Sequence, residues 1–173
     1  MESNLHNFLV WISLPVIGLP AIFIFAFVSA TLLPLASEPA LFAYVKLNPE
    51  MIWIAIVVAT FGNVLGGMVD WFMGYGAHKA HDKFMGSRNY GLLRWFEKLG
   101  PKVLLFAWLP IVGDPLCALA GWLKHPWMQC LLYMTIGKFL RYITMTYLLL
   151  AIPEGFWAGI YLWAKTILQA WFP

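Results

Sequence analysis

The chain has 173 residues, of which 62% are hydrophobic and 11% are charged, and its formal net charge is +3. Soluble domains usually carry about 25% charged residues, so a soluble fold of this length could not bury so many apolar side chains. The length, and the lack of a Ser-, Gly- or Pro-rich linker, indicate one domain. We therefore predict a single all-α integral membrane domain over residues 1–173.

The first third of the chain does not fit a simple membrane span. An apolar run covers residues 7–37, and only seven uncharged residues, 39–45, separate Glu38 from Lys46. A segment this short cannot cross a hydrocarbon core that needs about 20 helical residues. The pattern therefore predicts a re-entrant hairpin, in which the chain turns back within the membrane.

Three helix-breaking residues, Pro15, Gly18 and Pro20, lie inside this apolar run. Proline removes a backbone hydrogen-bond donor, and both residue types interrupt helices. We expect them to divide the run into a short interfacial helix near residues 4–14 and a half-helix near residues 21–35.

Met51–Val69 is the clearest candidate for a membrane-spanning helix. The whole stretch is uncharged and lies between Glu50 and Asp70, and its length is close to the roughly 20 residues that a span requires. Gly62 and Gly66 form a small-residue face, so another helix can approach the backbone closely at this point.

A basic segment follows at residues 76–102. Six Lys or Arg residues against two acidic residues give it a net charge of +4. The positive-inside rule places such a segment in the cytoplasm, and we prefer that explanation to nucleic-acid binding. Near its end, apolar residues recur at helical spacing and predict an amphipathic interfacial helix: Leu92, Trp95, Phe96 and Leu99.

His78 and His81 stand three residues apart beside Asp82, a spacing that resembles a metal site. In a basic cytoplasmic segment a solvated helix face explains them better, so we predict no metal. Cys117 and Cys130 do not form a Cys-x-x-Cys pair and are expected to be packing residues. We expect no cofactor.

The next apolar segment repeats the pattern of the first third. Val103–Gly113 offers 11 uncharged residues and Pro115–Leu123 offers nine, with Asp114 between them. A helix of 11 residues rises about 16 Å, half of a membrane. We predict a second re-entrant hairpin that turns at Gly113-Asp114-Pro115 and leaves the membrane at Lys124.

Pro126–Pro153 is the second predicted spanning helix. Lys138 and Arg141 interrupt it, with 12 uncharged residues on either side, so both cations are expected near the bilayer midplane. The last apolar stretch, Gly155–Phe172, is short and aromatic and predicts a C-terminal helix. Its Lys165 would snorkel to the interface or face the bundle.

The two hairpins belong to an internal repeat. Leu33–Pro39 and Leu109–Pro115 both read Leu-Pro-x-x-small-acid-Pro, and Thr60–Leu65 matches Thr135–Leu140 once a single deletion is allowed between the two blocks. One membrane crossing separates the copies, so they must have opposite orientations. Inverted repeats with broken helices at the midplane are typical of transporters.

The repeat divides the predicted domain into four parts. They are repeat 1 at about residues 21–75, the basic loop at 76–102, repeat 2 at about 103–152 and the C-terminal helix at 155–172. Small residues and prolines of the repeated motif are expected to make the hairpin turns: Pro34, Ser37, Pro39, Pro110, Gly113 and Pro115.

The predicted functional site consists of charged residues at the bilayer centre. Glu38 and Asp114 would reach the midplane from opposite sides, meet Lys138 and Arg141, and serve in proton coupling. The two cations share a helix face and could hold one anionic headgroup; Asn63, which aligns with Lys138, is the third candidate for substrate binding. Alternatively, these charges form ion pairs that only fix the hairpins. Ionisable groups at this depth usually mark a transport pathway, which favours the functional interpretation.

Four sequence blocks resemble the YqaA branch of the DedA membrane proteins, and they span roughly residues 25–150: SATLLPLASEP at 29–39, ATFGNVLGG at 59–67, WLPIVGDPLCALAG at 108–121 and GKFLRY at 137–142. The resemblance implies two re-entrant hairpins, a fold shared with lipid scramblases of eukaryotic endomembranes. It also implies transport of undecaprenyl phosphate across the inner membrane, often dependent on the proton gradient.

By matching position, the resemblance makes Glu38 the membrane acid of the first hairpin and Lys138 and Arg141 the basic residues of the second half. The chain departs from the family pattern at one place. Many members carry arginines beside the second-hairpin proline, where this chain has Ala107 and Gly113.

We therefore predict an inner-membrane transporter or scramblase for a phosphate-bearing lipid, with lipid and protons as partners. An intramembrane phosphatase would need a His nucleophile beside Arg and Ser, but His125 stands at a helix start, so we predict no enzyme. Two alternatives stay open, a proton-dependent antiporter for small solutes or ions and a non-transporting membrane homeostasis factor. A homo-oligomer is also left open.

The charge distribution makes a topological prediction. A reporter fused within residues 86–90 should read cytoplasmic and one near Asn48 should read external, because seven Lys or Arg lie on the first side against Lys46 alone on the other. Paired alkaline phosphatase and fluorescent-protein fusions measure this. An external signal from residues 86–90 would contradict the orientation of both repeats.

Overall fold

The computed structural model describes residues 15–31, 37–85, 99–109, 112–153 and 155–156, without the side chains of residues 15–16 and 81–85. Within these ranges the chain is helical and has no strand, which confirms the prediction of an all-α fold. The elements are α2 (Pro15–Thr31), α3 (Ser37–Leu47), η1 (Pro49–Met51), α4 (Ile52–Met85), η3 (Gly100–Trp108), α6 (Gly113–Trp122) and α7 (Trp127–Ala151).

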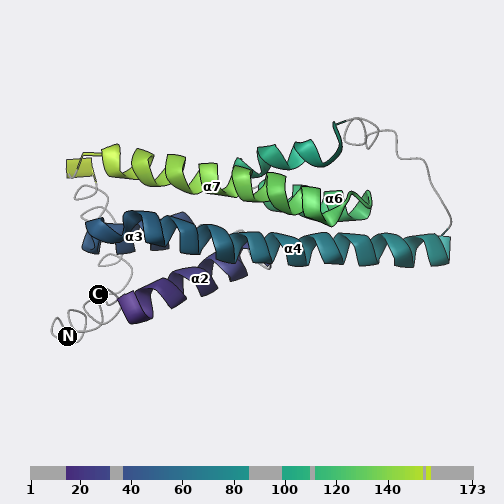
Figure 1. Cartoon of the computed structure of the whole chain (residues 1–173), viewed down its shortest axis with the longest axis horizontal. Helices are drawn as coiled ribbons and strands as arrows, with labels where there is room; N and C mark the ends of the chain where they lie inside the picture. Colours follow the sequence, from purple (N-terminus) through teal and green to yellow (C-terminus); the bar gives the residue numbers. More distant parts are fainter. Residues whose placement is uncertain (1–14, 32–36, 86–98, 110–111, 154, 157–173) are drawn as a thin grey trace, which may run out of the picture.

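Two long helices, α4 and α7, lie side by side along the molecule (Figure 1). The shorter helices α2 and α3 run in opposite directions to one another and pack beside the first half of α4. The short elements η3 and α6 also run in opposite directions to one another. They approach from the other end of the molecule and pack against the second half of α4 and the first half of α7. Each pair of short elements therefore precedes one long helix.

Helix lengths separate the long elements from the short ones. With a rise of 1.5 Å per residue, the 34 residues of α4 extend about 51 Å and the 25 residues of α7 about 37 Å, both more than the roughly 30 Å of a hydrocarbon core. The 11 residues of α3 and 10 residues of α6 reach only about half of it. Among the described residues, one helical stretch, 49–80, is both long and apolar enough to cross a membrane.

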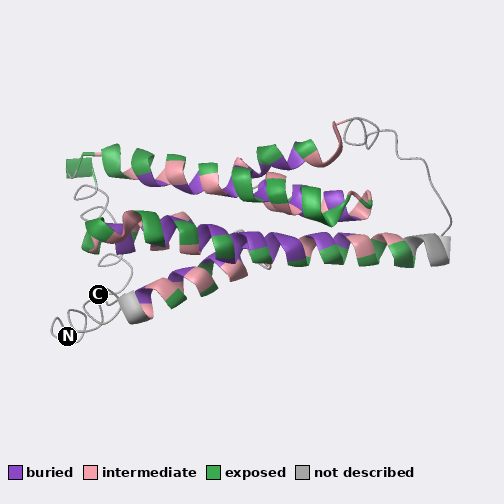
Figure 2. Cartoon of the chain, viewed as in Figure 1, coloured by how far each residue is buried: buried purple, intermediate pink, exposed green. Residues whose placement is uncertain are grey.

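The helices carry many apolar side chains on their outward faces. Buried residues line the faces where the helices meet, and the outward faces are exposed (Figure 2). Large hydrophobic side chains on these outward faces are about half exposed or more, among them Trp53, Phe61, Phe72, Leu132 and Leu148. Exposed apolar side chains in this number are unfavourable in water and favourable in lipid.

The interior contains two apolar clusters, one beside each pair of short helices. One joins α2, α3, α4 and Tyr142 of α7, and the other joins α4, η3, α6 and the first half of α7. Cys117 and Cys130 are free, fully buried members of the second cluster, which confirms their prediction as packing residues. Along α4, Asn63 lies between the residues of the first cluster and those of the second. Lys138 has the corresponding place along α7.

Glycines at equivalent repeat positions let the short elements approach the long helices. A Cβ on Gly62 would overlap the backbone of Phe23 in α2, and a Cβ on Gly137 would crowd the carbonyls of Leu104 and Leu105 in η3. Gly62 and Gly137 are aligned with one another in the repeat that matches Thr60–Leu65 to Thr135–Leu140. The sequence repeat thus corresponds to a repeated packing contact.

The predicted helix boundaries need three corrections. α2 continues through Gly18 and Pro20 instead of breaking there, because the apolar side chains of α2 pack along α4 and Pro20 projects from its exposed side. α4 does not end at Val69 but extends to Met85, so the predicted loop 76–102 begins with helical turns. An α-helix of 11 residues was expected over Val103–Gly113. The structure instead has a 3₁₀ helix over Gly100–Trp108.

The described residues of the repeated motif mark the beginnings of helices, where turns were expected. Ser37 and Gly113 are the first residues of α3 and α6, and Pro39 and Pro115 follow in the first turn, where proline lacks no helical hydrogen bond. Pro34 and Pro110, the helix near 4–14, the amphipathic helix before Leu99 and the C-terminal helix after Phe156 lie outside the described residues.

The close packing of α4 against α6 gives a stability prediction. A Cβ on Gly74 would overlap the carbonyl of Ala118, whereas Gly76, on the same helix, has nothing within 4 Å. Gly74→Ala should therefore destabilise the fold by about 1–3 kcal/mol, while Gly76→Ala should be neutral or slightly stabilising. Thermal melting of the purified protein in detergent compares the two, and equal melting temperatures would contradict the α4–α6 contact.

Candidate functional site

Two cationic side chains are buried in the middle of α7. Lys138 is 0% exposed and Arg141 is 7% exposed. They are three residues apart and therefore point to neighbouring parts of one helix face. Such charges are costly away from water unless they are paired and hydrogen-bonded, so their partners determine what the site can do.

Lys138 is held by α6 and α4. Its Nζ donates to Oδ1 of Asp114 at 2.9 Å and to the backbone carbonyl of Asn63 at 2.7 Å. Asp114 lies in the first turn of α6, where the positive end of the helix dipole also stabilises a carboxylate. Gly67 makes room for this contact, because a Cβ there would lie 2.8 Å from Nζ.

Arg141 forms an ion pair with Glu38 of α3, which belongs to the pair of short helices α2 and α3. Its Nε donates to Oε1 of Glu38 at 2.6 Å, and its Nη2 contacts the same oxygen. Glu38 lies in the first turn of α3, the position that corresponds to Asp114 in α6. α7 therefore neutralises its two charges with one acid from each pair of short helices.

A hydrogen-bonded network of neutral side chains lies beside the two ion pairs. The hydroxyl of Tyr142 lies 2.7 Å from Oγ of Ser37 and accepts a bond of 3.1 Å from Nδ2 of Asn63, which also contacts the carbonyl of Ala26 at 3.3 Å. Asn63 contacts Lys138 through its own carbonyl. The network therefore joins α2, α3, α4 and α7 at one level of the bundle.

Two buried polar atoms in the site have no partner among the described residues. They are Nη1 of Arg141 and Oδ1 of Asn63. Most buried polar atoms in proteins are hydrogen-bonded, and an unpaired one carries a free-energy penalty of about 1–3 kcal/mol. The site thus has a spare cationic donor and a spare acceptor that a ligand or water can use.

The structure brings together the residues that the sequence singled out, as two ion pairs. Lys138 pairs with the acid of its own repeat, and Arg141 pairs across with the acid of the other. Asn63 belongs to the same cluster. Ser37, predicted only as a turn residue, is a member of the network.

Sequence analysis missed Tyr142 and Asp70. Tyr142 follows Arg141 directly and is fully buried, but a single tyrosine in an apolar helix gives no signal on its own. Asp70 interacts electrostatically with both Asp114 and Lys138. It lies two helical turns after Asn63, and this spacing could have placed it on the same face of α4.

Comparison with known proteins gives relatives over most of the chain. The chain is 34% identical over 129 residues to the inner membrane protein YqaA of Escherichia coli (strain K12), an alignment that covers 75% of this chain and 89% of that protein. YqaA of Shigella flexneri matches to the same extent. An uncharacterized protein of Haemophilus influenzae is 34% identical over 134 residues, 73% of this chain and 83% of its own. No family model matches, and no solved structure matches significantly.

Proposed function

The chain belongs to the YqaA family of DedA-type inner membrane proteins, and on that premise we propose that it moves a phosphate-bearing lipid across the bacterial inner membrane. The observation that carries this proposal is the buried cation pair Lys138 and Arg141, with an unpaired donor on Arg141 among the described residues. Undecaprenyl phosphate is the substrate that the family resemblance implies.

The geometry of Arg141 supports binding of a phosphate. A guanidinium usually binds an oxyanion through two parallel N–H···O bonds. Here Nε and Nη2 share one oxygen of Glu38, and Nη1 has no partner in the part of the chain that the structure describes. A phosphate has more acceptor oxygens than a carboxylate, so it can engage donors that Glu38 leaves unused and compete for Arg141.

The arrangement of the helices supports an inverted repeat of two re-entrant hairpins. The pairs α2–α3 and η3–α6 approach from opposite ends of α4 and α7 (Figure 1). The first turns of α3 and α6 both contact the middle of α7 through Glu38 and Asp114. In a bilayer this arrangement would bring the first turns of α3 and α6 near the midplane, with repeat 1 at about 21–75 and repeat 2 at about 103–152.

In this proposal the acids couple lipid movement to protons. When a phosphate displaces Glu38 or Asp114 from its cation, that carboxylate loses the charge that stabilises its ionised form and takes up a proton. Asp70 is a third acid within electrostatic range of Asp114 and Lys138. The same three acids also favour the second candidate, a proton-dependent antiporter of small ions.

The orientation we propose puts the basic segment 76–102 in the cytoplasm. The last turns of α4, which belong to this segment, would project into the cytoplasm. The chemistry is transport and not catalysis, since binding and release at the ion pairs require no covalent step. Each short hairpin would expose the cluster to one side of the membrane in turn, as in other inverted-repeat transporters.

Substitution of the two cations tests the proposal. Lys138→Ala and Arg141→Ala should each reduce transport about 10- to 100-fold, the equivalent of one or two charge-assisted hydrogen bonds. Arg141→Lys should be partly impaired, because an ammonium cannot form two parallel bonds. Lys102→Ala, at an exposed position of η3, is the matched control.

The measurement is transbilayer movement of undecaprenyl phosphate and of a labelled phospholipid in liposomes that contain the purified protein. Thermal melting separates loss of transport from loss of folding. Full transport by the double alanine variant would contradict the proposal, and transport of a small ion without lipid would favour the antiporter.

The acids give a separate prediction about pH. Glu38→Gln and Asp114→Asn keep size and hydrogen bonding but cannot titrate, so transport by these variants should lose its dependence on a pH gradient. Each change leaves a buried cation without its acid, and a destabilisation of about 3–5 kcal/mol is expected. Glu50→Gln, at an exposed position, is the control. An unchanged pH dependence in both amide variants would exclude these acids as the titrating groups.

A further inference from the structure

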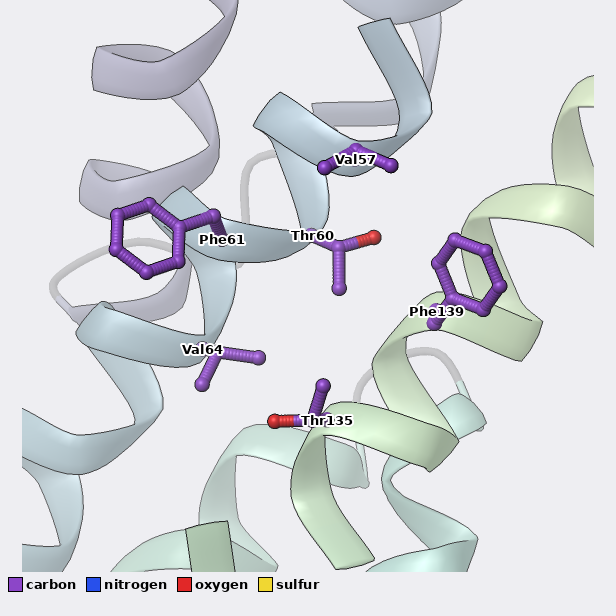
Figure 3. Close-up of a pocket in the computed structure, with 6 residues that line it drawn as sticks. All are labelled: Val57, Thr60, Phe61, Val64, Thr135 and Phe139. Carbon is purple, nitrogen blue, oxygen red and sulfur yellow. The ribbon is translucent and has the colours of Figure 1, made fainter. Parts of the chain in front are cut away.

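An apolar groove lies between α4 and α7 on the outer side of the bundle. Its volume is about 190 Å³, and six residues from the two helices line it: Val57, Thr60, Phe61, Val64, Thr135 and Phe139 (Figure 3). Val57 and Phe61 are more than half exposed. The groove is therefore accessible from the surface that faces lipid.

The two threonines contribute methyl groups to the groove and no free hydroxyl. Oγ1 of Thr60 donates to the carbonyl of Ile56 and Oγ1 of Thr135 to the carbonyl of Leu131, both at 2.7 Å. Figure 3 shows their methyl groups directed toward one another across the groove. Water in this space would find few partners, so the lining is suited to hydrocarbon.

The groove lies at the same level of the bundle as the charged cluster. Thr60 and Val64 align with Thr135 and Phe139 in the internal repeat, and the same alignment pairs Asn63 with Lys138. Residues three or four apart are neighbours on a helix surface. On each long helix the groove residues therefore flank the residue that contributes to the cluster.

We propose that this groove holds part of the hydrocarbon chain of the lipid whose phosphate binds Lys138 and Arg141. The inference rests on the proposed function and assigns a site to the second part of the same substrate. A headgroup drawn into the bundle must leave its chain outside in the membrane, and two residues that line the groove, Thr135 and Phe139, flank Lys138 along α7. A cavity of about 150 Å³ accommodates benzene, so 190 Å³ accommodates several carbons of a chain.

Filling the groove should remove the chain site without touching the cluster. Thr135→Phe introduces a ring from α7, and Val57→Trp reaches into the groove from α4; both positions are exposed, so folding should tolerate the larger side chains. Ile136→Phe is the matched control, because Ile136 is exposed on α7 next to Thr135 but does not line the groove.

The probe is phosphatidic acid with a photoreactive diazirine in its acyl chain, at low mole fraction in phosphatidylcholine nanodiscs. Mass spectrometry of the labelled protein should find adducts at residues 57–64 and 135–139, and excess unlabelled phosphatidic acid should compete with them. Thr135→Phe and Val57→Trp should reduce this labelling at least fivefold. Ile136→Phe should change it less than twofold.

Binding of phosphatidic acid, measured separately by native mass spectrometry, distinguishes the possible failures. Saturable binding with labelling spread evenly over the outer faces of α4 and α7 would overturn the groove site and leave the proposed function intact. No saturable binding of phosphatidic acid would overturn the groove site, and no binding of undecaprenyl phosphate in the same assay would overturn the proposed function as well. A third outcome is a wild-type dimer with no adducts in the groove, which Thr135→Phe converts to a monomer. That outcome would assign the groove to a second copy of the chain and overturn the inference.

Discussion

Neutralisation of two charges on α7 is the constraint on which the arrangement of the other helices depends. Lys138 and Arg141 lie at the middle of a helix whose exterior is apolar, where an unpaired cation costs several kcal/mol. Each pair of short helices supplies one acid, in the first turn of α3 or α6. α3 and α6 must therefore extend to the centre of the bundle, and their lengths of 11 and 10 residues allow them to do so.

Small residues make this geometry sterically accessible. In lipid the hydrophobic effect does not drive helices together, so close backbone contact has to provide the packing energy. A Cβ would overlap neighbouring backbone at Gly74 and Gly121, where α4 meets α6, and would crowd the ammonium group of Lys138 at Gly67. Gly67 thus has a second role, because it lets Lys138 reach the carbonyl of Asn63.

Sequence analysis could predict the elements that charge and periodicity specify. The uncharged runs predicted the long helices. The repeated Leu-Pro-x-x-small-acid-Pro motif identified the two acids that pair with α7. It could not predict that Arg141 pairs with the acid of the other repeat, because that depends on how the hairpins pack. The continuity of α2 through Pro20 is likewise a result of tertiary packing against α4, which outweighs local propensity.

The two copies of the repeat differ at the positions where α7 carries its cations. In the repeat alignment, Asn63 stands in α4 where α7 has Lys138, and Gly66 stands where α7 has Arg141. Glu38 and Asp114 pair with the two cations, and Asp70 interacts electrostatically with Asp114 and Lys138, so these five groups have a formal charge of −1 when all are ionised. Under the proposed function, a bound phosphate would add negative charge to this cluster, and the added charge would favour uptake of protons by the acids.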